Sequence, residues 1–401
     1  MRGGNTKRVS VALSVAAICF MSRGAQASDF FNLSATGTTT TVSANGSNVL
    51  NLADELIQRD SQFASLSGQA VTGSLRFGTL NHAINFTENA GGTSATLTIP
   101  STGFTRTFTA ANSAALDTQI RNFLKTDGAN AYADLIKVVD RTSPVAATDG
   151  NPLSSTAVIA DDPFNRFGLR PLPPSGSSEF RVESDGGVDR AGGINGNFAD
   201  LDFSGNWALT ANIGLSLGTD LQYLNQGGST SYTVAEVLAL PVVVMEQPHD
   251  TFYWEVTPWG FGGLAASYDE AAGTVLVGGG LTSSVGFRAG DFTFAVADQG
   301  SYGTDVGVTV DGYDFHVPVN QWILKNGASV SWRPGNGPIS FDGAGSVTNF
   351  LQDAAVPLYY TGEAGIAYHF SPHWSIRASY VGDFAPHYTV TGGELELLAR
   401  F

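Results

Sequence analysis

An alternation of apolar and polar residues, broken at Thr219 and Leu224, runs through LTANIGLSLGTDLQYLN, residues 209–225, and it limits the possible folds more than any other feature of the chain. Because successive side chains of a β-strand point to opposite faces, this segment predicts a strand with one apolar and one polar face. Strands of soluble proteins usually hold about five or six residues, whereas a membrane-spanning strand needs about 9 to 11. The length of the run therefore favours a transmembrane β-barrel over a soluble β-sandwich.

The same period of two recurs through the C-terminal half of the chain, for example in YTGEAGIAYHF at 360–370. Twelve strands can be drawn, and an even number agrees with both ends of the barrel lying on one side of the membrane. Ten or fourteen strands are the alternatives, because residues 303–320 are taken as an external loop although they could pair. The predicted strands are 178–186, 191–203, 207–225, 231–246, 252–267, 274–287, 291–302, 321–332, 339–348, 356–370, 374–384 and 389–401.

All six tryptophans lie in this alternating half, and two of them follow turn-like sequences, SGNW at 204–207 and SPHW at 371–374. Both turns are expected on the same side of the membrane. Membrane barrels carry girdles of aromatic residues at both interfaces, while the alternative is that tryptophan fills a β core. The predicted girdle residues are Trp207, Tyr368, Phe370, Trp374 and Tyr380.

Charge predicts what fills the inside of the barrel. From residue 189 onward there are 21 Asp and Glu but six Lys and Arg. A charge that faces lipid near the membrane midplane costs a few kcal/mol, so the charged strand residues should face an aqueous lumen that favours cations. The predicted lumen charges are Asp220, Glu363, Arg377, Asp383, Glu394 and Glu396. The same acidity argues against nucleic acid as a partner.

The N-terminus has the layout of a cleavable export signal at residues 1–27, with a basic start, an apolar stretch near 9–21 and Ala25-Gln26-Ala27. Removing these residues takes away four basic residues and Cys19, the only cysteine, so the net charge falls from −16 to about −20. An apolar stretch this short does not fit a permanent membrane helix.

Residues 28–142 predict a small α+β domain. Apolar residues at helical spacing occur in 51–66, and 112–140 predicts two helices that break at Asp127-Gly128. Several short alternating runs separated by Gly, Pro and Asn complete the pattern. Residues 143–177, which end in RPLPPSGS, predict a linker or a plug-like segment in front of the barrel at 178–401.

The chain ends in GGELELLARF, in which Leu395, Leu397, Ala399 and Phe401 lie on one side of a strand. With the export signal and the long alternating strands, this ending resembles bacterial outer-membrane β-barrels, in which such a C-terminal signal is recognised by the barrel-assembly machinery. The resemblance covers residues 1–27 and 178–401. It implies an outer-membrane location, the lipid bilayer and the assembly machinery as partners, and possible passage of small solutes.

A narrower resemblance is to autotransporters, whose twelve-stranded C-terminal barrel follows an exported passenger domain. The chain departs from that pattern, because residues 28–142 contain no β-helix repeats and are short for a passenger. The segment before the first strand also lacks a clear helix that would thread the pore.

Catalytic motifs are missing from the sequence, which contains no H-E-x-x-H, no G-x-S-x-G and no phosphate-binding loop. A barrel-embedded hydrolase could use Asp305, Asp311, Asp314 and His316, or Asp383 with His387, but a solvated acidic loop explains the first group more simply. We predict a protein that is not an enzyme and has no cofactor or metal. Its expected role is porin-like passage of small solutes or a structural or binding role at the cell surface, with an autotransporter-like translocator as the alternative.

Overall fold

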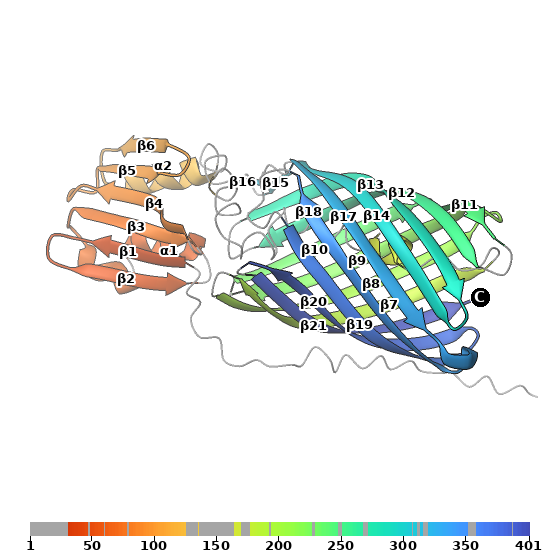
Figure 1. Ribbon diagram of the computed structural model, residues 1–401. Coiled ribbons are helices and arrows are strands. Elements are labelled where there is room, and N and C mark those ends of the chain that lie inside the picture. Colours follow the sequence, from red (N-terminus) through yellow and green to blue (C-terminus); the bar gives the residue numbers. More distant parts are fainter. Residues whose placement is uncertain are drawn as a thin grey trace, which may run out of the picture.

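The computed structural model describes residues 31–46, 49–59, 61–77, 80–125, 135, 164–169, 177–191, 194–226, 229–247, 251–267, 272–306, 308–310, 313–315, 320–351, 358–386 and 388–401. These residues form a small N-terminal domain and a β-barrel (Figure 1). The predicted signal at 1–27 and the linker residues 143–163 lie outside them. No helix in the described part of the chain is long and apolar enough to cross a membrane.

The barrel is a closed ring of twelve antiparallel strands, so the predicted fold class is confirmed. Each strand pairs with its neighbour in the sequence, and the ring closes where β21 pairs with β7. β10 and β11 form one strand that Leu240 and Pro241 interrupt, and both halves pair with β12. The strands are β7 Ser178–Ala191, β8 Ile194–Ala208, β9 Gly214–Gln226, β10 Ser229–Ala239, β11 Val242–Glu246, β12 Phe252–Ser267, β13 Ala272–Ala289, β14 Phe292–Val306, β17 Asn320–Trp332, β18 Ile339–Phe350, β19 Leu358–Ser371, β20 Trp374–Ala385 and β21 Tyr388–Arg400.

The turn predicted from SGNW at 204–206 is wrong, and so is the unbroken strand predicted at 207–225, because β8 ends at Ala208 and β9 begins at Gly214. Residues 204–207 lie within β8, and the chain turns at 209–213, where Thr210 Oγ1 accepts hydrogen bonds from the backbone N–H groups of Asn212 at 3.2 Å and Ile213 at 3.0 Å. Ser204 and Asn206 are buried inside the barrel. Polar residues on the lumen side of a strand therefore imitate the composition of a turn.

The segment 303–320 contains paired strands, contrary to the expected loop. β14 continues to Val306, and β15 (Val308–Val310) pairs with β16 (Tyr313–Phe315) as a separate hairpin. This hairpin is not part of the ring, so the count of twelve is unchanged.

The two ends of the barrel differ in their connections. The first and last residues of the ring lie together, because the N–H of Ser178 donates to the carbonyl oxygen of Phe401 at 2.9 Å and the N–H of Phe401 donates back at 2.8 Å. We call this the proximal end. The opposite, distal end carries the longest connections, residues 307–319 and 351–357.

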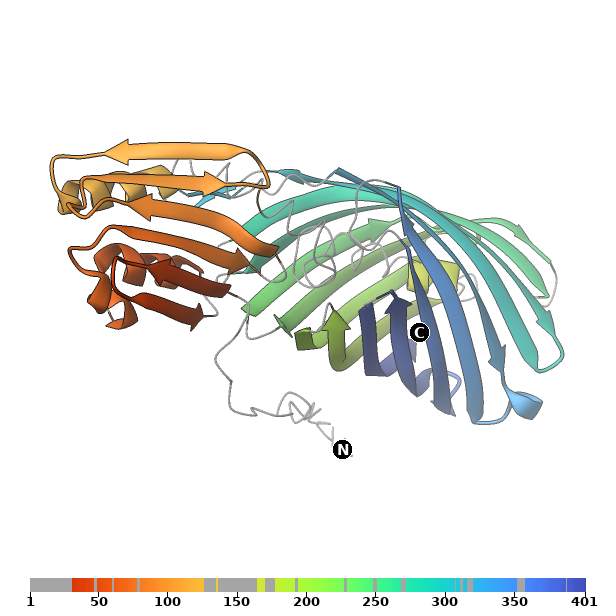
Figure 2. The same ribbon diagram turned by 60° about the vertical axis from the view of Figure 1, so that its left-hand side comes forward.

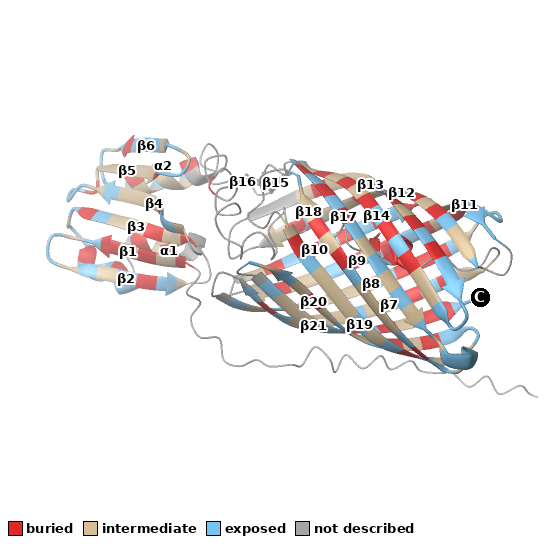
Figure 3. Ribbon diagram, in the orientation of Figure 1, coloured by how far each residue is buried: buried red, intermediate tan, exposed pale blue. Residues whose placement is uncertain are grey.

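Buried and more exposed residues alternate along the barrel strands (Figure 3). Many of the charged strand residues are buried inside the barrel, and many large apolar residues are exposed on its outside. On β21, Glu394 and Glu396 are buried while Leu395 is 53% exposed. The pattern is the reverse of a soluble protein, in which charged residues are exposed and large apolar residues are buried. It is the arrangement that a barrel surrounded by lipid requires.

The N-terminal domain is a six-stranded antiparallel sheet with helices, as the sequence predicts. The sheet order is β2-β1-β3-β4-β5-β6. Its main core contains Phe31, Phe63, Leu66, Phe77 and Leu135, all at most 1% exposed. The elements are β1 Phe31–Thr36, β2 Thr41–Gly46, α1 Val49–Gln58, η2 Ser61–Leu66, β3 Val71–Phe77, β4 Leu80–Glu88, β5 Ser94–Ile99, β6 Phe104–Thr109 and α2 Ser113–Lys125.

The helices of this domain differ in detail from the prediction. The segment 51–66 is interrupted at Arg59, whose φ of 56° ends α1 and separates it from the 3-10 helix η2. α2 is the first of the two helices predicted in 112–140, and Leu135 is the described part of the second.

The domain lies at the distal end of the barrel (Figures 1 and 2). Ala385 at the end of β20 and Val390 near the start of β21 pack against the domain core, and α2 contacts β16. The domain and Ser178, where the barrel begins, are thus at opposite ends of the ring.

Candidate functional site

A short segment of the chain occupies the interior of the barrel. Residues Phe164–Leu169, which we call the plug segment, contain one turn of π-helix (η3, Phe164–Gly168) and are buried except for Asn165. The hydroxyl of Ser284 on β13 donates to the carbonyl oxygen of Gly168 at 2.6 Å, and that of Ser329 on β17 donates to the carbonyl oxygen of Leu169 at 3.0 Å. The barrel wall therefore binds the plug segment through its backbone as well as its side chains.

One side of the lumen is apolar and holds the two phenylalanine rings of the plug segment. Phe167 packs in a cluster with Trp259, Phe261 and Leu276. Phe164 belongs to a second cluster with Leu169 and Ala297, and the ammonium of Lys325 lies over its ring, 5.1 Å from the centroid. Burying an aromatic ring and placing a cation over its face both stabilise the bound segment.

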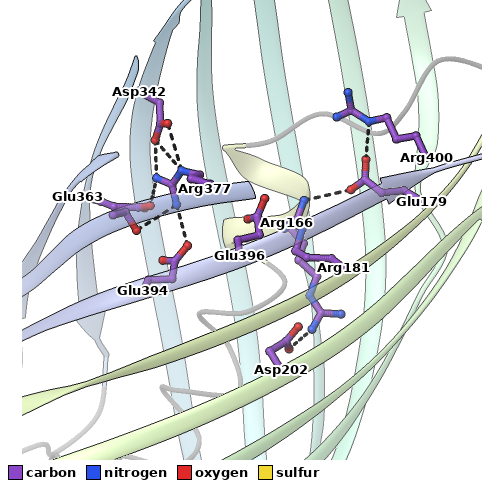
Figure 4. A network of polar contacts seen from close by, with 11 residues as sticks. Arg166, Glu179, Arg181, Asp202, Asp342, Glu363, Arg377, Glu394, Glu396 and Arg400 are labelled. Atoms are coloured by element: carbon purple, nitrogen blue, oxygen red, sulfur yellow. Dashed lines mark hydrogen bonds and ion pairs between the residues drawn. The ribbon is translucent and has the colours of Figure 1, made fainter. Parts of the chain in front are cut away.

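The opposite side of the lumen is acidic and receives Arg166 from the plug segment. This guanidinium, 4% exposed, forms an ion pair with Asp202 on β8 (Figure 4). It also lies against Gly218 on β9, where an added Cβ would come within 1.9 Å of Arg166 Nη1. The glycine leaves the space that the arginine occupies, so wall and plug fit each other.

A second arginine joins four neighbouring strands across the lumen. Arg377 on β20 contacts Asp342 on β18, Glu363 on β19 and Glu394 on β21 (Figure 4). Its Nε lies 3.0 Å from Asp342 Oδ2, and its Nη1 lies 2.7 Å from Glu394 Oε1. Buried carboxylates need such a partner, because an unpaired charge out of water is costly.

A third group of charges lies across the seam between the first and last strands. Arg181 on β7 donates to Glu179 at 3.1 Å, and its Nε lies 3.8 Å from Glu396 on β21. Arg400 Nε donates to the other oxygen of Glu179 at 3.0 Å. These contacts reinforce the backbone pairing that closes the ring.

The plug segment leaves a cavity of about 410 Å³ on its proximal side. Asn165 and Leu169 of the plug segment line it together with wall residues at the proximal end. The polar part of the lining includes Glu179, Arg181, Glu255, Arg288, His369 and Arg400.

The structure places the six predicted lumen charges on the inner side of the barrel. Arg377, Glu363 and Glu394 contact one another, and Glu396 joins the seam group. Asp220, 4% exposed, lies on β9 beside Gly218, and Asp383 accepts a hydrogen bond from Thr361 at 2.6 Å. Sequence reasoning missed Arg166, Arg181 and Asp342. Arg181 alternates with Glu179 and Glu183 on β7, so the same period of two could have identified it.

The predicted girdle and terminal residues lie on the outer side. Trp207, Tyr368, Phe370, Trp374 and Tyr380 are between 41% and 59% exposed. All but Tyr380, which lies midway along β20, are near the proximal end. Phe401 is 69% exposed and meets Trp374 edge to face, with ring centroids 6.2 Å apart. Ala399, the register partner of Trp374, is buried. Leu395 is exposed and Leu397 is half-buried.

Neither a metal centre nor a hydrolase site is established. Glu183, Glu394 and Glu396 bring carboxylate oxygens within 4.8 Å of one another, a spacing that could hold a cation. Arg377 and Arg181 beside Glu394 and Glu396 already supply positive charge there. Asp305 and Asp383 are described, whereas Asp311, His316, His387 and the side chain of Asp314 lie outside the described residues. The hydrolase alternative therefore stays a prediction.

No family model and no curated protein matches the chain. Among solved structures, the translocator domain of the autotransporter NalP from Neisseria meningitidis is 15% identical, with a TM-score of 0.45 over 64% of this chain and 100% of that one. The transport unit of the autotransporter AIDA-I from Escherichia coli is 11% identical, with a TM-score of 0.42 over 62% of this chain and 98% of that one. The NanC porin is 9% identical, with a TM-score of 0.36 over 54% and 98%. Likeness at this level assigns no role, so the function has to come from the chain's own geometry.

Proposed function

We propose that the protein is an outer-membrane β-barrel that carries its own N-terminal domain at the cell surface, in the manner of an autotransporter translocator. The barrel anchors the chain in the membrane, and the plug segment closes the lumen through which the chain passes. The N-terminal domain is then the part that meets the outside.

The position of the plug segment carries this proposal. The N-terminal domain lies at the distal end, the plug segment lies inside the lumen, and the barrel begins with Ser178 at the proximal end. Leu135, residues 164–169 and Ser178 thus lie in turn at the distal end, inside the lumen and at the proximal end, and we infer from this order that the chain crosses the barrel through its interior. A porin that only passes solutes has no need for its own chain to take this path.

The membrane orientation follows from the two rims. In outer-membrane barrels the longer connections face the outside and the short turns face the periplasm. The distal end has the longest connections, so it is the outer end and the N-terminal domain lies outside. We further infer that residues 1–27 direct export and that Leu395, Leu397, Ala399 and Phe401 present the C-terminal signal to the assembly machinery.

A second candidate function is cation-favouring passage of small solutes. The acidic side of the lumen, with Asp185, Asp200, Asp202 and Asp220 on adjacent strands, supports this role. Passage would require the plug segment to leave its place, because its rings fill the apolar side of the lumen.

Protease treatment of intact cells tests the proposed function. We expect the domain at residues 31–125 to be cut from whole cells while the barrel, detected by an epitope in the proximal turn 333–338, stays in the outer membrane. A periplasmic marker protein must survive the same treatment. If the domain is protected in intact cells and digested only after the outer membrane is permeabilised, the outside placement is wrong.

A further inference from the structure

Among the described residues, two carboxylates lie on the apolar outer face of the barrel. Glu236 on β10 and Asp298 on β14 are exposed at positions where the described neighbours on the same face are mostly apolar. Glu236 accepts a hydrogen bond from Thr219 on β9 at 3.0 Å, and Asp298 accepts one from Asn326 on β17. An ionisable residue that faces lipid costs free energy, so we expect another group to cover each of these carboxylates.

Asp298 lies at the middle of the outer face. On β14 it is four residues from Phe294 on the proximal side and four from Tyr302 on the distal side. Its partner Asn326 on β17 lies between Trp322 and Trp332, which contact Tyr302 at 5.0 Å and Phe292 at 6.0 Å between ring centroids. Aromatic rows of this kind mark the two interfaces. The Asp298–Asn326 pair is therefore as far from water as a residue of this face can be.

We propose that the outer face of β14 and β17 is the contact surface for a second copy of this chain. Asp298 and Asn326 are directly opposite each other in the strand register. When two barrels face each other about a two-fold axis along the membrane normal, Asp298 of one copy meets Asn326 of the other, and the reverse contact follows by symmetry. The surface is thus complementary to itself.

The hydrogen-bonding groups of Asp298 and Asn326 fit a second copy of the chain. The amide nitrogen of Asn326 carries two hydrogens, and within one chain it donates to Asp298. Its other hydrogen can be donated to Asp298 of the second copy, so four side chains join in one ring of hydrogen bonds. Lipid tails offer these groups no donor and no acceptor.

Small residues around Asp298 and Asn326 allow the backbones of two copies to approach closely, as these short side chains require. Gly300 follows Asp298 by two residues on β14, Ala328 follows Asn326 by two on β17, and Gly345 is the register partner of Ala328 on β18. All three positions belong to the outer side. Small residues let the backbones of two membrane segments come near enough for polar side chains to bridge them.

Cysteine cross-linking tests the contact directly. In the full chain with Cys19→Ser, Ala328→Cys places a thiol beside the proposed axis, and Ala378→Cys places one on the exposed outer face of β20 as a matched control. After mild oxidation in lipid vesicles at low protein density, we expect a disulfide-linked dimer from Ala328→Cys and monomer from Ala378→Cys. Equal yields from the two variants, or no dimer from Ala328→Cys, would overturn the proposal.

Dimerisation measured by dilution in vesicles tests the polar pair. Interhelical hydrogen bonds in membranes contribute modestly, so the double change Asp298→Ala with Asn326→Ala should weaken the dimer about tenfold. Glu236→Ala with Thr219→Ala removes the other polar pair and should leave dimerisation unchanged. The same affinity in the first variant and the wild type would refute the role of this pair. Heat-modifiable migration on a gel verifies that each variant is folded.

Discussion

Removing the two aromatic rings of the plug segment should open the barrel. Phe164 and Phe167 are 0% and 1% exposed, and they lie in separate apolar clusters. Truncating a buried phenylalanine to alanine costs about 3–5 kcal/mol, and changes in separate clusters add. The double variant Phe164→Ala with Phe167→Ala therefore loses about 6–10 kcal/mol of the free energy that holds the segment.

The interactions that remain in the double variant contribute less free energy to holding the segment. Two hydrogen bonds to its carbonyl oxygens contribute about 0.5–1.5 kcal/mol each, and Arg166 keeps its ion pair with Asp202. A loss of 6 kcal/mol corresponds to a factor of about 10⁴ in the equilibrium between bound and released segment. The double variant should spend much of its time with the apolar side of the lumen vacant.

Planar bilayer recordings on purified full-length protein measure this effect. We expect wild-type barrels to be nearly silent and the double variant to conduct, with a preference for cations set by the acidic side of the lumen. Phe341→Ala is the matched control, because its ring lies on the outer face and is 43% exposed. If the double variant conducts no more than this control, the two rings do not close the lumen and the reasoning is refuted.

Three further predictions concern stability and assembly. Arg377→Met removes the cation beside the buried Glu394 and the half-buried Asp342 and Glu363, so it should lower the free energy of unfolding in urea by about 3–5 kcal/mol, and a loss below about 1 kcal/mol would contradict the lumen network. Deleting Phe401, which is mostly exposed against Trp374, should hardly change the stability of assembled barrels but should reduce their number in outer-membrane fractions, and unchanged assembly would show that Phe401 is not a recognition signal. In the N-terminal domain, burial raises the pKa of Glu88 above its ordinary value although Arg59 lowers it. The folded domain then binds a proton more tightly than the unfolded chain, so it gains stability as the pH falls through the folded pKa. Hydrogen exchange in β4 should slow on acidification in the wild type relative to Glu88→Gln, after correction for intrinsic rates, and an equal response would contradict this.

The sequence predicts the barrel wall well because each wall residue faces either lipid or the lumen and has a matching polarity. Polarity therefore alternates with a period of two along each strand, and this period predicts both the number of strands and the inner position of Arg377. The same rule misleads at SGNW. Ser204 and Asn206 face the lumen, where a polar residue is satisfied, so a strand there has the composition of a turn.

The contents of the lumen are much harder to predict. The site for Arg166 depends on Gly218 and Asp202, which lie 52 and 36 residues further along the chain. No local periodicity links these positions, because they meet only when the ring has closed around the plug segment. Composition alone can predict only a linker or plug at 143–177. Prolines and serines disfavour regular structure, but they do not say where in the molecule the segment lies.

The proposed path takes the chain through a ring without a free edge, and such a path requires a fixed order of assembly. The N-terminal domain, with its six-stranded sheet and packed helices, is far wider than one turn of chain such as residues 164–169, which already fills part of the bore. The domain must therefore reach its side of the barrel unfolded, or before β7 pairs with β21. Its core is complete only with Leu135, so folding waits until almost the whole domain has crossed. Because the chain beyond residue 27 contains no cysteine, no disulfide can form early and stop the passage. Each barrel can then deliver one domain, and only its own.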